Sequence, residues 1–239
     1  MKIALIGYGK MGKAIEEIAL SKGHEIILKI NDENLAELTS INLQKCDVAI
    51  EFTNPESAVT NMKTCIDAGV PVICGSTGWV AKENEIIQYC NKKQGSLLYS
   101  SNFSIGVNIF FEINTRLAQL IKSQKGYSVA IEETHHTQKK DAPSGTAISL
   151  AQQIINENPS IQNWTLNSPS TENEIHITSN RIDPAPGTHH VKYSSEIDDI
   201  EIIHTAHSRN GFATGALVAA EFIAGKKGIF NMADVLKIV

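Results

Sequence analysis

The 239-residue sequence contains little cysteine, little arginine and no long apolar run. Its four cysteines are too few and too widely spaced for a disulfide framework or a CxxC metal or redox motif, so we interpret them as small buried side chains in a reducing compartment. No stretch approaches the roughly 18 apolar residues of a membrane-spanning helix. The short N-terminal apolar run ends in glycine without a cleavage-like segment, so we expect a cytoplasmic protein.

The ionisable residues are unevenly distributed. Only three of the 21 basic residues are arginines, whereas seven of the eight histidines lie between His135 and His207. Because histidine titrates near neutral pH, this clustering indicates a proton-handling site, with local drift in composition as the alternative. The net charge of −5 provides no global positive field for nucleic acid or an anionic membrane.

The first hundred residues alternate short β-branched runs with helical patterns. This alternation predicts a Rossmann-type doubly wound parallel sheet with right-handed crossovers. The strands are expected at 3–6, 25–30, 48–52, 70–74 and 97–99.

After about residue 104 the pattern changes, and it predicts a second α+β domain on an open mixed sheet. A polar segment rich in Ser, Asn, Thr and Pro, 159–173, is expected to be a surface loop. Strands are expected at 128–133, 176–180, 189–195 and 200–206, and helices at 107–122, 144–156, 213–224 and 233–238.

A glycine-rich motif, Gly7-Tyr8-Gly9-Lys10-Met11-Gly12, follows the first expected strand and opens a helix. Glycines at this spacing permit a tight turn and let backbone amides approach a pyrophosphate at the helix N-terminus. An ordinary strand–helix turn would also explain it, but its place in a βαβ unit favours dinucleotide binding.

The end of the second expected strand reports on the type of cofactor. Asp32 favours NADH, because an acid at this position bonds the ribose 2′-hydroxyl. Asn31 and the nearby Lys29 leave NADPH open, and a simple turn is the alternative.

Two further loops follow strands at the carboxyl edge, where sheets of this kind bind ligands. Gly75-Ser76-Thr77-Gly78 is a candidate for the nicotinamide ribose, and Ser100-Ser101-Asn102-Phe103 for the nicotinamide carboxamide. The alternatives are an ordinary strand–helix loop and a hinge between the two halves.

The segment from Glu132 to Thr146 has the highest concentration of ionisable residues suited to catalysis or anion binding. It leaves a strand with His135 and His136, crosses a charged loop, and enters a helix whose first amides, Gly145 and Thr146, form a seat for a carboxylate. We disfavour a zinc site, because adjacent histidines on a strand point to opposite faces and no cysteine or HExxH pattern accompanies them. We therefore expect no metal, with a solvated charged loop as the remaining alternative.

Together these segments resemble the 4-hydroxy-tetrahydrodipicolinate (dihydrodipicolinate) reductase family, in register over nearly the whole chain. The part from His135 to Thr146 is the most specific. The resemblance implies hydride transfer from NADH or NADPH to C4 of a cyclic dicarboxylate in bacterial diaminopimelate and lysine biosynthesis. Two more segments carry it, Glu51-Phe52-Thr53-Asn54-Pro55 and Asn102-Phe103-Ser104-Ile105-Gly106-Val107-Asn108.

The resemblance also implies roles for individual residues. His135 would donate or accept a proton and Lys139 would donate one, while His136 and the amides of Gly145 and Thr146 would hold substrate carboxylate. It implies a homotetramer joined through the sheets of the second domain, and a hinge between domains. The nucleotide domain would span 1–104, completed by 211–239, and the substrate and oligomerisation domain 105–210.

Some residues depart from the family pattern. Asn31-Asp32 stands where an acid followed by arginine is common, which leaves the nucleotide preference open. A later segment keeps Arg181, Gly187 and His189 but has two prolines between them. The alternatives to this reductase are a related reductase of another small anionic substrate and a non-catalytic nucleotide sensor.

Overall fold

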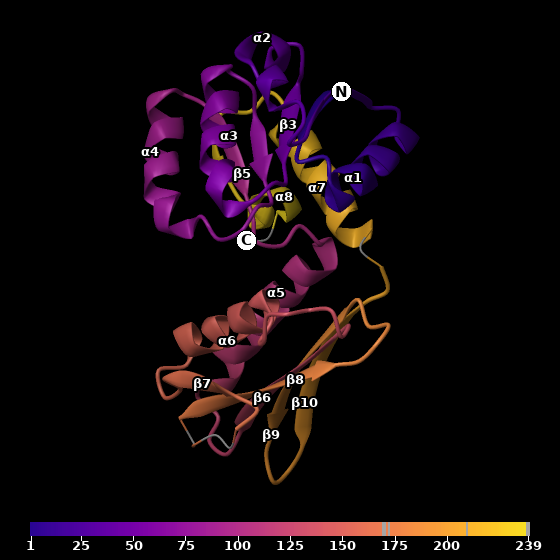
Figure 1. The fold of residues 1–239 in the computed structure, drawn as a ribbon. Helices are drawn as coiled ribbons and strands as arrows, with labels where there is room; N and C mark the ends of the chain where they lie inside the picture. Colours follow the sequence, from indigo (N-terminus) through magenta and orange to yellow (C-terminus); the bar gives the residue numbers. More distant parts are fainter. Residues whose placement is uncertain (169–170, 172, 209, 238–239) are drawn as a thin grey trace. The chain divides into compact units, whose positions relative to one another are not determined.

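The computed structural model describes residues 1–168, 171, 173–208 and 210–237 (Figure 1). The chain divides into two compact units, one of Met1–Ile105 with Asn210–Val239, and one of Gly106–Arg209. Among the described residues, no helix combines the length and apolar character needed to cross a membrane.

The first unit is built on a six-stranded sheet in which every pair of neighbouring strands is parallel. The strand order is β11-β5-β4-β3-β1-β2. The predicted Rossmann-type sheet is therefore confirmed. Its strands are β1 (Lys2–Ile6), β2 (Glu25–Ile30), β3 (Val48–Glu51), β4 (Val72–Cys74), β5 (Ser96–Tyr99) and β11 (Gly228–Phe230).

Helices cover both faces of this sheet (Figure 1). Alternate residues of β1 point to opposite sides, so that Ile6 joins one apolar core and Leu5 the other. Helices α3 (Pro55–Asp67) and α4 (Glu83–Lys92) pack on the first core, and α1 (Lys10–Ser21) and α7 (Asn210–Ile223) on the second. Two shorter helices are α2 (Ser40–Leu43) and α8 (Met232–Leu236).

The cysteines all lie in the first unit. Cys46, Cys65, Cys74 and Cys90 are buried and have free thiols, as the sequence predicted. Burial raises the pKa of the Cys46 thiol to about 11, so this thiol stays protonated at neutral pH.

The second unit contains a five-stranded mixed sheet in the order β10-β9-β6-β8-β7. Strand β8 runs parallel to β6 and β7, whereas β9 is antiparallel to β6 and β10. The predicted open mixed sheet is confirmed. Its strands are β6 (Ser128–His135), β7 (Asn163–Leu166), β8 (Glu174–Arg181), β9 (Gly187–Ser194) and β10 (Asp199–Ala206).

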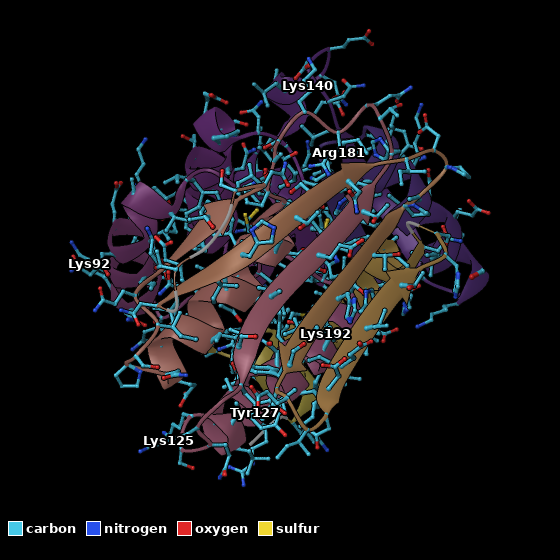
Figure 2. The ribbon with its side chains drawn as sticks, turned by 90° about the horizontal axis from the view of Figure 1, so that it is seen from below. Lys92, Lys125, Tyr127, Lys140, Arg181 and Lys192 are labelled. Carbon is cyan, nitrogen blue, oxygen red and sulfur yellow. The ribbon has the colours of Figure 1, made fainter. Side chains whose placement is uncertain are left out.

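Only one face of this mixed sheet is covered by helices within the described residues. Helices α5 (Ile105–Ile121) and α6 (Gly145–Glu157) pack on it around an apolar core that includes Ile131 and Val191. Figure 2 looks onto the other face, where the strands lie in front of these helices.

Two edge strands, β7 and β11, were not predicted from the sequence. The predicted loop 159–173 contains β7, which pairs with β8 and packs Trp164 against the apolar core; residues 169, 170 and 172 of this segment lie outside the described residues. Strand β11 was not predicted and pairs with β5. Both strands are too short for a detectable period of two, and pairing with a longer neighbour stabilises them.

Candidate active site

The glycine-rich turn joins β1 to α1 through contacts that a side chain would prevent. Gly7 has φ of +96°, and a Cβ there would lie 2.0 Å from the carbonyl oxygen of Phe52. A Cβ on Gly12 would lie 2.5 Å from the carbonyl oxygen of Gly7. The N-cap residue of α1, Gly9, offers no side-chain cap, so the first-turn amides of α1 have no side-chain oxygen competing for them there.

The other predicted nucleotide loops follow β4 and β5 at the same carboxyl edge of the sheet. Gly75 packs so closely on the Phe52 ring that a Cβ would lie 2.2 Å from it. The Ser76 hydroxyl accepts a hydrogen bond from the amide of Thr53, at 2.8 Å, and Thr77 is exposed. The topology therefore brings the loop after β4 beside the residues that follow β3.

The loop after β5 divides into exposed and buried parts. Ser101 is exposed, whereas the Ser100 hydroxyl donates to the carbonyl oxygen of Asn102 at 2.7 Å. The Phe103 side chain belongs to the apolar core. The backbone carbonyl oxygen of Phe103 packs against Gly215, where a Cβ would lie 1.7 Å from it. Ser101 is thus exposed and Ser100 half-buried at the predicted edge, whereas the side chains of Asn102 and Phe103 are buried.

The end of β2 forms a local turn. The Asn31 carboxamide oxygen accepts from the backbone amides of Glu33 and Asn34, at 2.9 and 3.2 Å, and Asp32 is exposed. The nearby Lys29 ammonium lies 2.5 Å from the Glu16 carboxylate. Lys29 is therefore ion-paired with Glu16, and Asp32 and Glu33 are exposed carboxylates at this turn.

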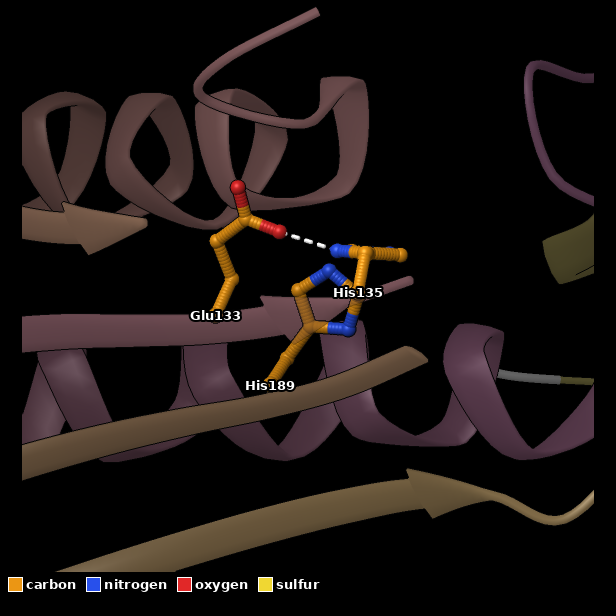
Figure 3. A group of neighbouring side chains, drawn as sticks. All are labelled: Glu133, His135 and His189. Carbon is orange, nitrogen blue, oxygen red and sulfur yellow. Dashed lines mark hydrogen bonds and ion pairs between the residues drawn. The ribbon is translucent and has the colours of Figure 1, made fainter. Parts of the chain in front are cut away.

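In the second unit, Glu133, His135 and His189 form a buried cluster at the ends of two strands (Figure 3). Glu133 and His135 are two residues apart on β6 and so share one face of the sheet. The register of β6 against β9 places Glu133 opposite His189, and the register against β8 places His135 opposite Arg181. The cluster therefore depends on strand pairing.

Both carboxylate oxygens of Glu133 accept hydrogen bonds. Oε2 accepts from Nδ1 of His135, while Oε1 accepts from Nη2 of Arg181 at 3.0 Å and from the backbone amide of Ser144 at 3.2 Å. Burial raises the pKa of Glu133, but interactions with neighbouring side chains, first the hydrogen bond from His135 and then others including that from Arg181, outweigh burial and lower the pKa to about 2. Glu133 is therefore a buried carboxylate anion at neutral pH.

His189 is a neutral neighbour of this pair. Burial, followed by the proximity of His135, lowers the pKa of His189 to about 3. Its Nε2 lies 3.0 Å from the Ser144 hydroxyl, which caps α6 by accepting from the amide of Ala147 at 3.2 Å. The two imidazole rings meet edge to face, with centroids 5.1 Å apart.

The loop between β6 and α6 carries the other predicted residues. Lys139 is half-buried and paired with Asp141, and Lys140 is exposed. His136 is half-buried next to His135, and Gly145 and Thr146 are the first two residues of α6. The structure therefore places all the predicted catalytic and substrate-binding residues on β6, on this loop or on the first turn of α6.

No role for Glu133 was predicted from the sequence, although its position two residues before His135 predicts a shared face on a strand. Arg181 and His189 were noted only through the family resemblance, because their contacts depend on strand register. The donor atoms of Glu133, His135 and His189 lie within 4.8 Å of one another, a donor set that can hold a metal ion. Both Glu133 oxygens, Nδ1 of His135 and Nε2 of His189 make direct hydrogen bonds, whereas Nδ1 of His189 is buried without one. The absence of a metal stays a prediction.

A parallel doubly wound sheet with a glycine-rich first turn, next in sequence to a unit with a carboxylate–histidine pair and a cationic loop, defines a dinucleotide-dependent oxidoreductase. Models of the dihydrodipicolinate reductase N-terminus and C-terminus match residues 1–103 and 106–236. The chain therefore belongs to the dihydrodipicolinate reductase family, which uses a nicotinamide cofactor through its N-terminal Rossmann-type unit.

Similar proteins cover nearly the whole chain. A 4-hydroxy-tetrahydrodipicolinate reductase from Christiangramia forsetii is 49% identical over 236 residues, which are 99% of this chain and 98% of that protein. The enzyme of the same name from Buchnera aphidicola is 33% identical, covering 89% of this chain and 81% of the relative. A dipicolinate-bound dihydrodipicolinate reductase from Paenisporosarcina sp. TG-14 shares the fold, with TM-score 0.81, 21% identity and coverage of 100% and 99%.

Proposed function

We propose that this protein reduces 4-hydroxy-tetrahydrodipicolinate to tetrahydrodipicolinate with NADH or NADPH, in diaminopimelate and lysine biosynthesis. The observation that carries the proposal is the ionised Glu133 hydrogen-bonded to His135, four residues before Lys139, in a chain of this family. A histidine held by a carboxylate is suited to general acid–base chemistry.

The first unit binds the dinucleotide in this proposal. The turn from Gly7 to Gly12 holds the pyrophosphate, and the turn at Asn31 and Asp32 contacts the adenosine ribose. The loops Gly75–Thr77 and Ser100–Phe103 contact the nicotinamide end, Phe103 through its backbone because its side chain is buried. When bound, the nicotinamide supplies the hydride.

The second unit binds the dicarboxylate and handles protons. His136 and the first-turn amides of α6, from Gly145 and Thr146, hold substrate carboxylate, because a helix N-terminus and nearby cations favour anions. Replacing the C4 hydroxyl by hydrogen releases water and consumes one proton. His135 and Lys139 are the residues that deliver or accept protons in this step.

The nucleotide preference follows from the end of β2. The exposed Asp32 carboxylate would accept from a ribose 2′-hydroxyl and repel a 2′-phosphate. Lys29, the nearby cation, is already paired with Glu16. We therefore propose that NADH is accepted at least as well as NADPH.

The helix-free face of the mixed sheet supports the proposal of a homotetramer. This face carries Ile203, which is 59% exposed, beside a network in which Lys192 bonds Asp199 and Glu201 at 2.6 and 3.0 Å. An exposed β-branched apolar side chain beside charged side chains is suited to a subunit interface. Light scattering of the purified protein would measure the assembly, and a monomer would contradict this proposal.

The activity is tested with freshly prepared product of dihydrodipicolinate synthase. Nucleotide oxidation that depends on this substrate is expected, and its absence with both NADH and NADPH would refute the proposal. Binding of pyridine-2,6-dicarboxylate, measured by calorimetry, separates the reductase from a nucleotide sensor, because a sensor has no need of a dicarboxylate site.

A further inference from the structure

We propose that Glu133 is a positioning residue that fixes His135 as the tautomer with its proton on Nδ1, and that presents the Nε2 lone pair for proton transfer. The proposal rests on the proposed function, in which His135 handles the proton. It assigns to Glu133 a role in orientation and tautomer selection, acting through His135 rather than on the substrate.

The tautomer follows from the chemistry of the hydrogen bond. An ionised carboxylate has no proton to give, so in the contact between Glu133 and His135 the donor is Nδ1 of the imidazole. The pKa of Glu133, lowered to about 2, keeps the carboxylate ionised throughout the neutral range. A neutral His135 therefore carries its only ring proton on Nδ1 and its lone pair on Nε2.

The carboxylate is itself held in place. Glu133 is fully buried, and its second oxygen is bound by the Arg181 guanidinium and the Ser144 amide. Arg181 also donates to the carbonyl oxygens of Asn180 and Asp141, at 2.7 and 2.6 Å. Glu133 thus connects β6 with the end of β8 and with the residue that caps α6, so its orientation has little freedom.

The space beside Nε2 is bounded by a glycine. A Cβ at Gly187 would lie 3.0 Å from Nε2 of His135 and 3.3 Å from Cδ2. Any larger residue would press on the atom that carries the lone pair. The packing around His135 therefore engages Nδ1 with a carboxylate and leaves the Nε2 side beside a residue without a side chain.

The groups that set the charge around His135 come from four elements. They are Glu133 on β6, Arg181 on β8, His189 on β9, and Lys139 with Asp141 on the loop before α6. His189 stays neutral because burial lowers its pKa to about 3. Glu133 is thus the acid bonded directly to the imidazole, and its charge is shared with Arg181.

The test is to measure the tautomer in the full-length protein and in Glu133→Gln. Long-range proton–nitrogen NMR of the imidazoles distinguishes the two tautomers, and the signals missing from His135→Asn identify His135. The unsubstituted protein is expected to show the Nδ1-protonated form. In Glu133→Gln the amide oxygen keeps the bonds from Arg181 and Ser144 and the amide nitrogen faces Nδ1, so the Nε2-protonated form is expected.

The same variant is expected to lower kcat by about 10²–10⁴-fold while leaving nucleotide affinity unchanged, because the proton would sit on the wrong nitrogen. Glu133→Asp, which keeps the charge, should retain the Nδ1-protonated form and recover part of kcat. Glu51→Gln removes the other fully buried carboxylate among the described residues, in the first unit, and should not change the His135 tautomer.

An Nε2-protonated His135 in the unsubstituted protein would overturn the proposal, and this measurement stands even if Glu133→Gln fails to fold. An unchanged tautomer in folded Glu133→Gln, with kcat within about threefold of the parent, would also overturn it. If the tautomer changes as expected but the parent shows no reductase turnover, the positioning stands and the proposed function fails.

Discussion

Lys139 is ion-paired with a residue of its own loop, because its Nζ lies 2.9 Å from both carboxylate oxygens of Asp141. Burial raises the pKa of Asp141, but the hydrogen bond from Lys139 outweighs it and lowers the pKa. Arg181 also binds the Asp141 carbonyl oxygen, at 2.6 Å. Asp141 therefore anchors the ammonium group that we expect to serve as a proton donor.

Replacing this lysine tests its role. We expect Lys139→Ala to lower kcat by about 10²–10⁴-fold, because a positioned acid is lost, while the dissociation constant for NADH stays unchanged. Steady-state kinetics and nucleotide fluorescence titration measure the two quantities. Lys140→Ala is the matched control, since Lys140 is exposed on the same loop. A loss confined to nucleotide affinity would place Lys139 in a different site.

Gly187→Ala tests the access to Nε2 of His135. The added Cβ would lie 3.0 Å from Nε2 and would displace the His135 imidazole. We therefore expect kcat to fall by about 10- to 100-fold. Gly126→Ala is the control, because Gly126 also has positive φ, +95° against +154°, but no atom lies within 4 Å of its Cβ position. Equal losses of kcat in the two variants would show that backbone strain, and not the contact with His135, is responsible.

His189 makes the stability of the second unit depend on pH. Its pKa is about 3 in the folded protein against an ordinary 6.5, so the unfolded chain binds a proton in this interval and the folded chain does not. The free energy of unfolding therefore falls as the pH drops from 6.5 toward 3, by at most about 1.4 kcal/mol per pH unit from this residue.

We expect His189→Gln to flatten this dependence. Urea unfolding between about pH 6.5 and 5 is the measurement, since most carboxylates remain ionised there. His207→Gln is the control, because His207 is exposed. Parallel stability curves for the parent and His189→Gln would contradict the assignment of a neutral buried imidazole.

Asp32→Ala tests nucleotide selection at the end of β2. We expect KM for NADH to rise by about tenfold and KM for NADPH to fall or stay constant, because a 2′-hydroxyl acceptor and a repelling charge are both lost. Glu33→Ala, which removes the neighbouring exposed carboxylate of the same turn, should change neither value comparably. A strong preference for NADPH that persists in Asp32→Ala would refute this role.

Local sequence patterns were sufficient to predict the longer strands of both sheets and most of the helices that pack on them. Apolar runs such as 48–52 and the glycine turn at 7–12 are signals within a few residues, and they correspond to β3 and to the junction of β1 and α1. The edge strands β7 and β11 were not predicted, because three or four residues show too little periodicity and these strands are stabilised by pairing with a neighbouring strand.

The sequence by itself determined the parts of the candidate site that are continuous in the chain, from the histidine pair at the end of β6 to the start of α6. Only the tertiary structure decided which residues surround Glu133 and His135. Arg181, which binds Glu133, lies 48 residues further along the chain, and His189 lies opposite Glu133 on the neighbouring strand β9. A shift of one residue in strand register would turn these side chains to the other face, so the proton-handling cluster is a consequence of sheet pairing.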